Sequence, residues 1–95
     1  MDKIITIDSS RFSSLETFYV EIDNTLTKNL GWETGHNLDA LNDILRGGFG
    51  VYGYEEQIKM IWLDIKKAKS DLGQESVQKI LEIIKSHRHI DLILD

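Results

Sequence analysis

The 95-residue sequence contains no cysteine and no proline. Without cysteine the chain can have no disulfide bond, no thiolate nucleophile and no cysteine-bound metal. Apolar runs are short, because the longest, Met60–Leu63, falls far below the ~20 residues that a membrane helix needs. The N-terminal segment lacks the cationic and long apolar regions of a secretory signal. We therefore expect residues 1–95 to form one cytoplasmic domain in a reducing compartment, without a membrane partner.

Acidic side chains are concentrated in the first half of the chain, whose formal net charge is −5 at pH 7. Residues 1–45 carry eight acidic and three basic side chains, whereas residues 46–95 carry eight of each. An acidic surface repels the phosphates of nucleic acid and suits a basic protein partner. A small negative charge also keeps an ordinary domain in solution, so the charge alone does not decide the function.

Hydrophobic patterning predicts an α/β fold. Short apolar and β-branched runs indicate strands at residues 3–8, 58–64 and 90–94. Amphipathic spacing and capping residues indicate four helices. The first begins at Ser13 or Ser14 and runs to about residue 28, and the others cover residues 38–46, 65–72 and 75–86. Helices that separate three strands are typical of a parallel sheet with crossover connections.

The glycine-rich segment GGFGVYG, residues 47–53, is the obvious candidate for a phosphate-binding loop. Such a loop needs a strand before it and a helix after it, or a following lysine and hydroxyl residue. Here a predicted helix precedes the glycines, and Glu55 and Glu56, which would repel phosphate, follow them. We interpret the segment as a connecting loop.

The histidines do not indicate catalysis or metal binding. His87 and His89 flank Arg88, and a metal site would need further ligands and no adjacent cation. We expect them near the end of the final helix, where cations oppose the helix dipole favourably. His36 is a lone loop residue without an identifiable nucleophile to activate. An enzyme, a cofactor and a metal are therefore not expected.

The predicted helix at residues 38–46 is the segment whose pattern most clearly indicates a binding surface. At ~100° per residue, its apolar side chains share one face and its polar side chains, Asp39, Asn42, Asp43 and Arg46, share the other. Asp39 lies in the first turn, where the helix dipole favours an anion. Asp43 lies mid-helix, one turn from a like charge, where aspartate is unfavourable. An ordinary solvated helix face remains the alternative to a binding role for Asp43.

The two tryptophans differ in setting. Trp62 belongs to an apolar strand, so we expect it in the core. Trp32 falls in a loop flanked by glycines, where it is either a core residue or an interface anchor.

The segment GHNLDALNDIL, residues 35–45, resembles the G-x-N-L-D-A-L-x-D-x-L signature of the barstar family, bacterial inhibitors of secreted ribonucleases. The segment GQESV at residues 73–77 and the order of the predicted elements extend the resemblance over the chain. The resemblance implies a three-stranded parallel sheet flanked by helices. It also implies a basic ribonuclease partner, with Asp39 and Asp43 replacing substrate phosphates in its active site.

The chain departs from the family pattern at several positions. Glu33 and Thr34 stand where a family member has paired aromatics, with Trp32 one residue upstream. Asn42 replaces a tryptophan, and Glu82 is adjacent to the position of a peripheral glutamate. The resulting prediction for the partner-binding surface is Trp32, Glu33, His36, Asp39, Asn42, Asp43, Arg46 and Glu82. The alternative is a barstar-like acidic interaction module with no nuclease target.

Overall fold

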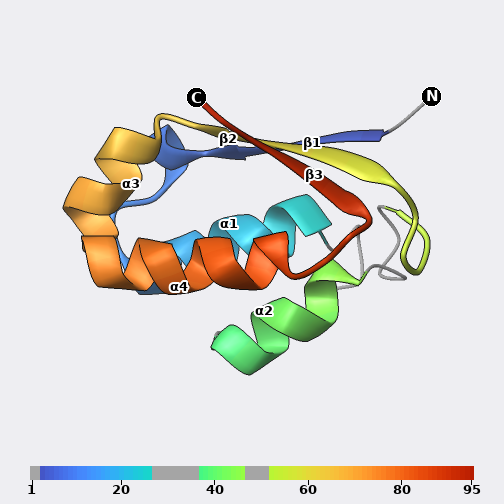
Figure 1. The fold of residues 1–95 in the computed structure, drawn as a ribbon. Helices are drawn as coiled ribbons and strands as arrows, with labels where there is room; N and C mark the ends of the chain where they lie inside the picture. Colours follow the sequence, from blue (N-terminus) through green and yellow to red (C-terminus); the bar gives the residue numbers. More distant parts are fainter. Residues whose placement is uncertain (1–2, 27–36, 47–51) are drawn as a thin grey trace.

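The computed structural model describes residues 3–26, 37–46 and 52–95 (Figure 1). In chain order the elements are β1 Lys3–Asp8, the 3₁₀ helix η1 Ser9–Arg11, α1 Leu15–Leu26, α2 Leu38–Leu45, β2 Ile58–Leu63, α3 Ile65–Leu72, α4 Gln74–Lys85 and β3 Ile90–Leu94. The predicted α/β fold is confirmed. The end of the first predicted helix and most of the glycine-rich segment lie outside the described residues.

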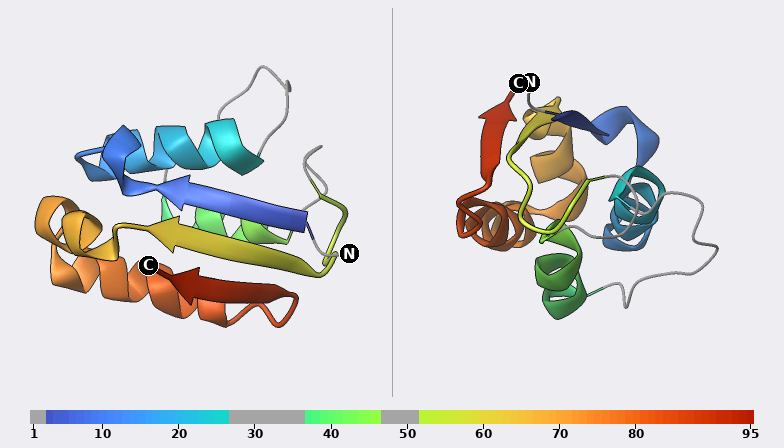
Figure 2. Two further views of the ribbon diagram at one scale, coloured as in Figure 1. Left: turned by 90° about the horizontal axis from the view of Figure 1, so that it is seen from above. Right: turned by 90° about the vertical axis from the view of Figure 1, so that its right-hand side faces the viewer.

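The sheet has the strand order β1-β2-β3, and both strand pairs are parallel. Side chains alternate between its two faces, and in β2 Ile58, Met60 and Trp62 are wholly buried. The helices lie on that face of the sheet in the described part of the chain (Figures 1 and 2). The register places Ile5 beside Met60, and Ile7 beside Trp62. The core therefore forms between one face of the sheet and the helices.

Trp62 lies in the centre of this core, as its position in the sequence predicts. Its ring stacks on Phe18 of α1 with centroids 5.6 Å apart, and its Nε1–H donates a hydrogen bond of 2.8 Å to Ser9 Oγ. Ser9 is wholly buried too. The short helix η1, which the apolar pattern did not reveal, therefore supplies the polar partner that a buried indole requires.

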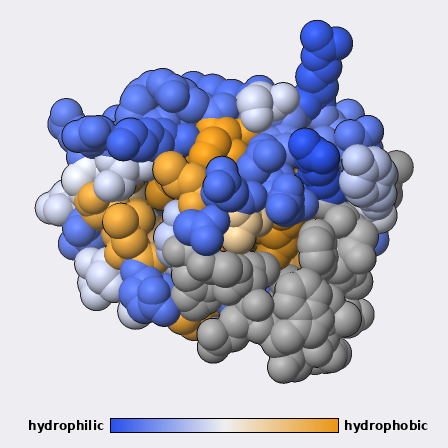
Figure 3. Space-filling model, turned by 90° about the horizontal axis from the view of Figure 1, so that it is seen from below, coloured by the Kyte–Doolittle hydropathy of each residue, from blue (hydrophilic) through white to orange (hydrophobic). Residues whose placement is uncertain are grey.

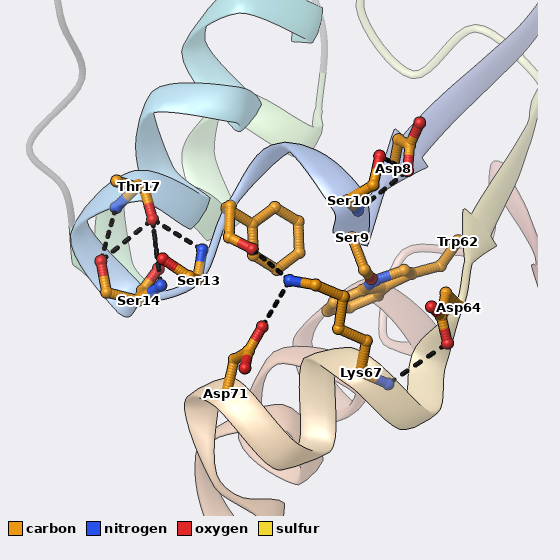
Figure 4. Close-up of polar contacts among 11 residues, drawn as sticks. Asp8, Ser9, Ser10, Ser13, Ser14, Thr17, Trp62, Asp64, Lys67 and Asp71 are labelled. Carbon is orange, nitrogen blue, oxygen red and sulfur yellow. Dashed lines mark hydrogen bonds and ion pairs between the residues drawn. The ribbon is translucent and has the colours of Figure 1, made fainter.

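The start of α1 is fixed by the residues that the sequence indicates. The backbone N–H of Thr17 donates to Ser14 Oγ at 3.3 Å, and the N–H of Phe18 donates to the Ser14 carbonyl at 2.8 Å. Thr17 Oγ1 in turn accepts from the backbone N–H groups of Ser13 and Ser14, both at 3.0 Å (Figure 4). Ser14 is thus the cap, since a side-chain oxygen satisfies N–H groups that have no partner within the helix.

The strand prediction for residues 58–64 is one residue too long. β2 ends at Leu63, and Asp64 adopts a left-handed conformation with φ 57°. Its Oδ1 accepts from the backbone N–H of Lys67 at 3.3 Å, so Asp64 caps α3 instead of extending the strand. The Lys67 ammonium group also donates to the Phe12 carbonyl at 2.8 Å and pairs with Asp71, which ties α3 to the segment after η1 (Figure 4).

α2 forms a separate layer below α1 and α4 (Figures 1 and 2). Its strongest packing is against α4. This arrangement places one side of α2 at the surface, at a distance from the sheet. None of the helices in residues 3–26, 37–46 and 52–95 has the length and apolar character that a membrane span needs.

Candidate partner-binding site

α2 begins and packs as its sequence predicts. The side chain of Asn37 caps the helix, because its Oδ1 accepts a hydrogen bond of 2.8 Å from the backbone N–H of Ala40. Leu41, Ile44 and Leu45 are almost completely buried. These contacts fix the rotation of the helix about its axis, and hence which side chains face outward.

Asp39 and Asp43 are both exposed on the outward side of α2. Within the described part of the chain, neither carboxylate takes part in an ion pair or a side-chain hydrogen bond. One helical turn separates them, which places their Cβ atoms about 5–6 Å apart. The arrangement leaves two neighbouring carboxylates open to cations from outside the molecule.

An apolar groove of about 430 Å³ lies beside Asp39, between α1 and α2. Leu15, Tyr19 and Leu38 supply its apolar lining. Leu15 is 40% exposed although the helical pattern assigns it to the buried face of α1. Figure 3 shows apolar side chains among hydrophilic ones on this side of the molecule. A partner that contacts Asp39 would therefore also meet apolar surface.

Asn42 is half-buried between the two aspartates, and its amide oxygen has a partner within the protein. The Nε2 atom of His87 lies 2.9 Å from Asn42 Oδ1. Because a carboxamide oxygen can only accept, the imidazole donates. Asn42 thus connects the outward side of α2 to the turn that follows α4.

His87 and His89 lie close to the end of the final helix, as predicted, but in the turn after it and not in its last turn. α4 ends at Lys85, where Ser86 Oγ donates to the Ile83 carbonyl at 2.6 Å, and both histidines lie in the turn before β3. His89 Nε2–H donates to the Leu45 carbonyl at 2.8 Å, and the two rings meet edge to face with centroids 5.5 Å apart. The histidines therefore hold α2 instead of opposing the dipole of α4.

Burial lowers the pKa of His87 below its ordinary value. The neighbouring His89 and Arg46 lower this pKa further, whereas Glu55 acts in the opposite direction. Burial also raises the pKa of Tyr52, whose hydroxyl donates to the Leu45 carbonyl at 2.8 Å. Both groups are thereby kept uncharged near neutral pH, as suits donors at the buried end of α2.

The other predicted site residues have different positions. Arg46 is exposed at the C-terminal end of α2, and Glu82 is exposed on α4, where its Oε1 accepts from Gln78 at 3.2 Å. Arg46 lies on the same side of α2 as the two aspartates. Glu82 lies on α4, the helix that packs against α2. The remaining predicted residues, Trp32, Glu33 and His36, lie outside the described residues.

The sequence interpretation missed the residues that hold α2, namely Tyr52, His87 and His89. The partners of the two histidines lie far along the chain, 45 residues away for the contact of His87 with Asn42, so no local pattern indicates them. Tyr52 lies only seven residues from Leu45, but in a segment that the sequence interpretation treated as a loop. In the described segments, no group of three or more histidine, cysteine, aspartate or glutamate side chains could hold a metal ion.

A family model described as Barstar (barnase inhibitor) matches residues 3–90. The chain belongs to the barstar family. The match confirms the resemblance seen in the sequence and covers the whole of α2. The barstar family is one of inhibitors, so membership supports a barnase-inhibitor-like role. No curated protein matches the sequence.

Proposed function

We propose that the protein inhibits a ribonuclease of the barnase type by placing α2 in the enzyme's cationic active site. Asp39 and Asp43 occupy the positions of substrate phosphates there. The observation that carries the proposal is that both carboxylates are exposed on a firmly packed helix and have no intramolecular partner among the described residues.

Carboxylates can take the place of phosphates because both are anions that accept hydrogen bonds from arginine, lysine and histidinium groups. Such charge-assisted bonds are about twice as strong as neutral ones. Asp43 contributes nothing evident to the folding of α2, since mid-helix aspartate is unfavourable and the side chain bonds to no described residue. A role in binding accounts for its presence.

The attachment of α2 also favours tight binding. The Asn37 cap, the buried leucines and the donors to the Leu45 carbonyl hold the helix before any partner arrives. A preformed surface loses less conformational entropy on association than one that must first become ordered. We infer that the protein acts by occlusion, as a cytoplasmic immunity protein or antitoxin, with Trp32, Glu33, His36 and Glu82 at the rim.

The test is inhibition of barnase by the wild type and by Asp43→Asn, with Asp91→Asn as the matched control. Asp91 is also an exposed aspartate, but it lies on β3 and away from α2. Loss of a hydrogen-bonded charge should cost about 2 kcal/mol, a factor of roughly 30 in the inhibition constant. We expect that loss in Asp43→Asn and no more than a twofold change, about 0.4 kcal/mol, in Asp91→Asn.

The same experiment yields the association rate at low and high salt. Steering of an acidic inhibitor to a basic enzyme should slow as the Debye length falls from ~10 Å at 0.1 M to ~3 Å at 1 M. Absence of barnase inhibition by the wild type, or equal inhibition by wild type and Asp43→Asn, would contradict the proposal.

A further inference from the structure

A polar groove of about 640 Å³ lies at the C-terminal end of α2. It runs between α2, the segment before β2 and the turn between α4 and β3, and we call it the cationic groove. Its lining includes Asn42, Arg46, Glu55, His87, Arg88 and His89. Because Asn42 and Arg46 flank Asp43 on the helix, a partner that contacts Asp43 also meets this groove.

The charged side chains of the groove are two arginines and one acid. Arg46 and Arg88 are both exposed, and in the described segments neither lies within 4.0 Å of a carboxylate oxygen. Glu55 is the acidic member of the groove. The charged side chains that line the cationic groove therefore include one more positive than negative group, within a chain whose net charge is −5.

The base of the groove is rigid and its own donors are already occupied. His87 is 9% exposed and its ring bonds to Asn42, and the ring of His89 bonds to the Leu45 carbonyl. The guanidinium groups of Arg46 and Arg88 are the charged donors that remain for a ligand, beside the neutral side-chain amides of Asn42 and Gln57. A guanidinium presents a planar fork of N–H groups that matches a carboxylate in two parallel hydrogen bonds.

We propose that the cationic groove receives an aspartate or glutamate side chain of the bound ribonuclease, with Arg46 and Arg88 as its donors. The inference rests on the proposed function, since the ribonuclease must lie on α2 to reach the groove. The surface is then bipolar: carboxylates on α2 meet the cations of the enzyme, and the adjacent groove meets one of its acids. The pairing of the groove arginines with an acid of the enzyme would give specificity. Among basic ribonucleases, it favours those that have an acidic residue at the matching position beside the active site.

The direction in which barnase affinity changes when an arginine of the groove is neutralised distinguishes a specific contact from long-range electrostatic attraction. Removing a positive charge makes the inhibitor more acidic, which by long-range attraction alone would strengthen its binding to a basic enzyme. A specific carboxylate in the groove predicts the opposite result. Arg46→Gln and Arg88→Gln should each weaken barnase binding about tenfold through faster dissociation. Lys69→Gln, which removes an exposed cation of α3, is the matched control.

The measurements are dissociation constants and rates for barnase, with urea unfolding to establish that each variant is folded. Weaker binding by both arginine variants and no weakening by Lys69→Gln supports the inference. Unchanged or tighter binding by the arginine variants, together with a loss in Asp43→Asn, overturns it and leaves ribonuclease inhibition standing. Unchanged binding by Asp43→Asn, or no binding of barnase at all, overturns the proposed function and this inference with it.

A separate titration of the free protein with inorganic phosphate tests the other anion that a guanidinium pair would accept. The NMR signals of the arginine Nε–H groups report binding directly. Saturation by phosphate at submillimolar concentration, combined with undiminished barnase binding by Arg46→Gln and Arg88→Gln, would identify a phosphate site and overturn the carboxylate assignment.

Discussion

The attachment of α2 to the rest of the molecule gives a quantitative prediction about cooperativity. The hydroxyl of Tyr52 and the Nε2–H of His89 both donate to the Leu45 carbonyl, each at 2.8 Å. Leu45 is wholly buried and lies in the last turn of α2, where a carbonyl has no partner within the helix. The two donors therefore share one buried acceptor. The carbonyl stays hydrogen-bonded if one donor is lost, but it loses both described partners if both are removed.

Tyr52→Phe and His89→Phe each remove one donor and keep an aromatic ring. Each should lower the free energy of unfolding by about 1 kcal/mol, because the carbonyl keeps its other donor. The double variant leaves a buried carbonyl without a described partner, which adds about 1–3 kcal/mol. We thus expect a total loss of about 3–5 kcal/mol, at least 1 kcal/mol more than the sum of the single losses.

Urea unfolding at one fixed pH, about 8, measures these free energies. Tyr54→Phe is the matched control, since Tyr54 is 66% exposed, and it should change stability by less than about 0.5 kcal/mol. Losses that add within about 0.5 kcal/mol would refute the shared-acceptor reasoning.

Two other predictions concern buried polar groups. His87 has a pKa below 6.5, so its stabilising contribution should be complete above that pH and be lost as pH falls through the folded-state value. The urea midpoint should therefore drop as pH falls below about 6.5, and His87→Gln should reduce this dependence; an unchanged pH profile in that variant would contradict the assignment. Ser9→Ala should cost about 1–3 kcal/mol, because it leaves the buried Trp62 N–H without its acceptor. Ser70→Ala, at an exposed serine of α3, should cost less than about 0.5 kcal/mol, and equal losses in the two variants would show that the indole bond is unimportant.

Much of the fold could be predicted because its elements depend on short-range patterns. The strands at residues 3–8 and 90–94 have the bounds that their apolar runs indicate, and the final helix is displaced by one residue from the predicted 75–86. The error at Asp64 has a local physical reason. An aspartate side chain can cap the following helix, and this residue type tolerates the left-handed backbone, so the strand ends one residue earlier.

The candidate site was predictable only in part. The amphipathic pattern of α2 was sufficient to place Asp39 and Asp43 on its outward side, and the barstar signature supplied the reason to regard them as contacts. The roles of His87 and His89 depend on side-chain contacts with residues 44 and 45 positions away. Such contacts are decided by how the layers pack, which no local periodicity encodes. The proximity of Arg88 to Arg46 could not be predicted either, because it depends on the turn after α4, which brings Arg88 close to α2.

The position of α2 as a layer of its own has a consequence for how this protein can evolve. Outward residues such as Asp39, Asp43 and Arg46 can be exchanged without disturbing Trp62 or the strands, because the helix rests chiefly on α4. Recognition and folding are thereby encoded at different positions of the same short chain. Lineages could acquire new enzyme targets by changing a few surface codons while keeping one inherited scaffold. Grafting another recognition helix onto the same capping and anchoring residues is the engineering counterpart of that process.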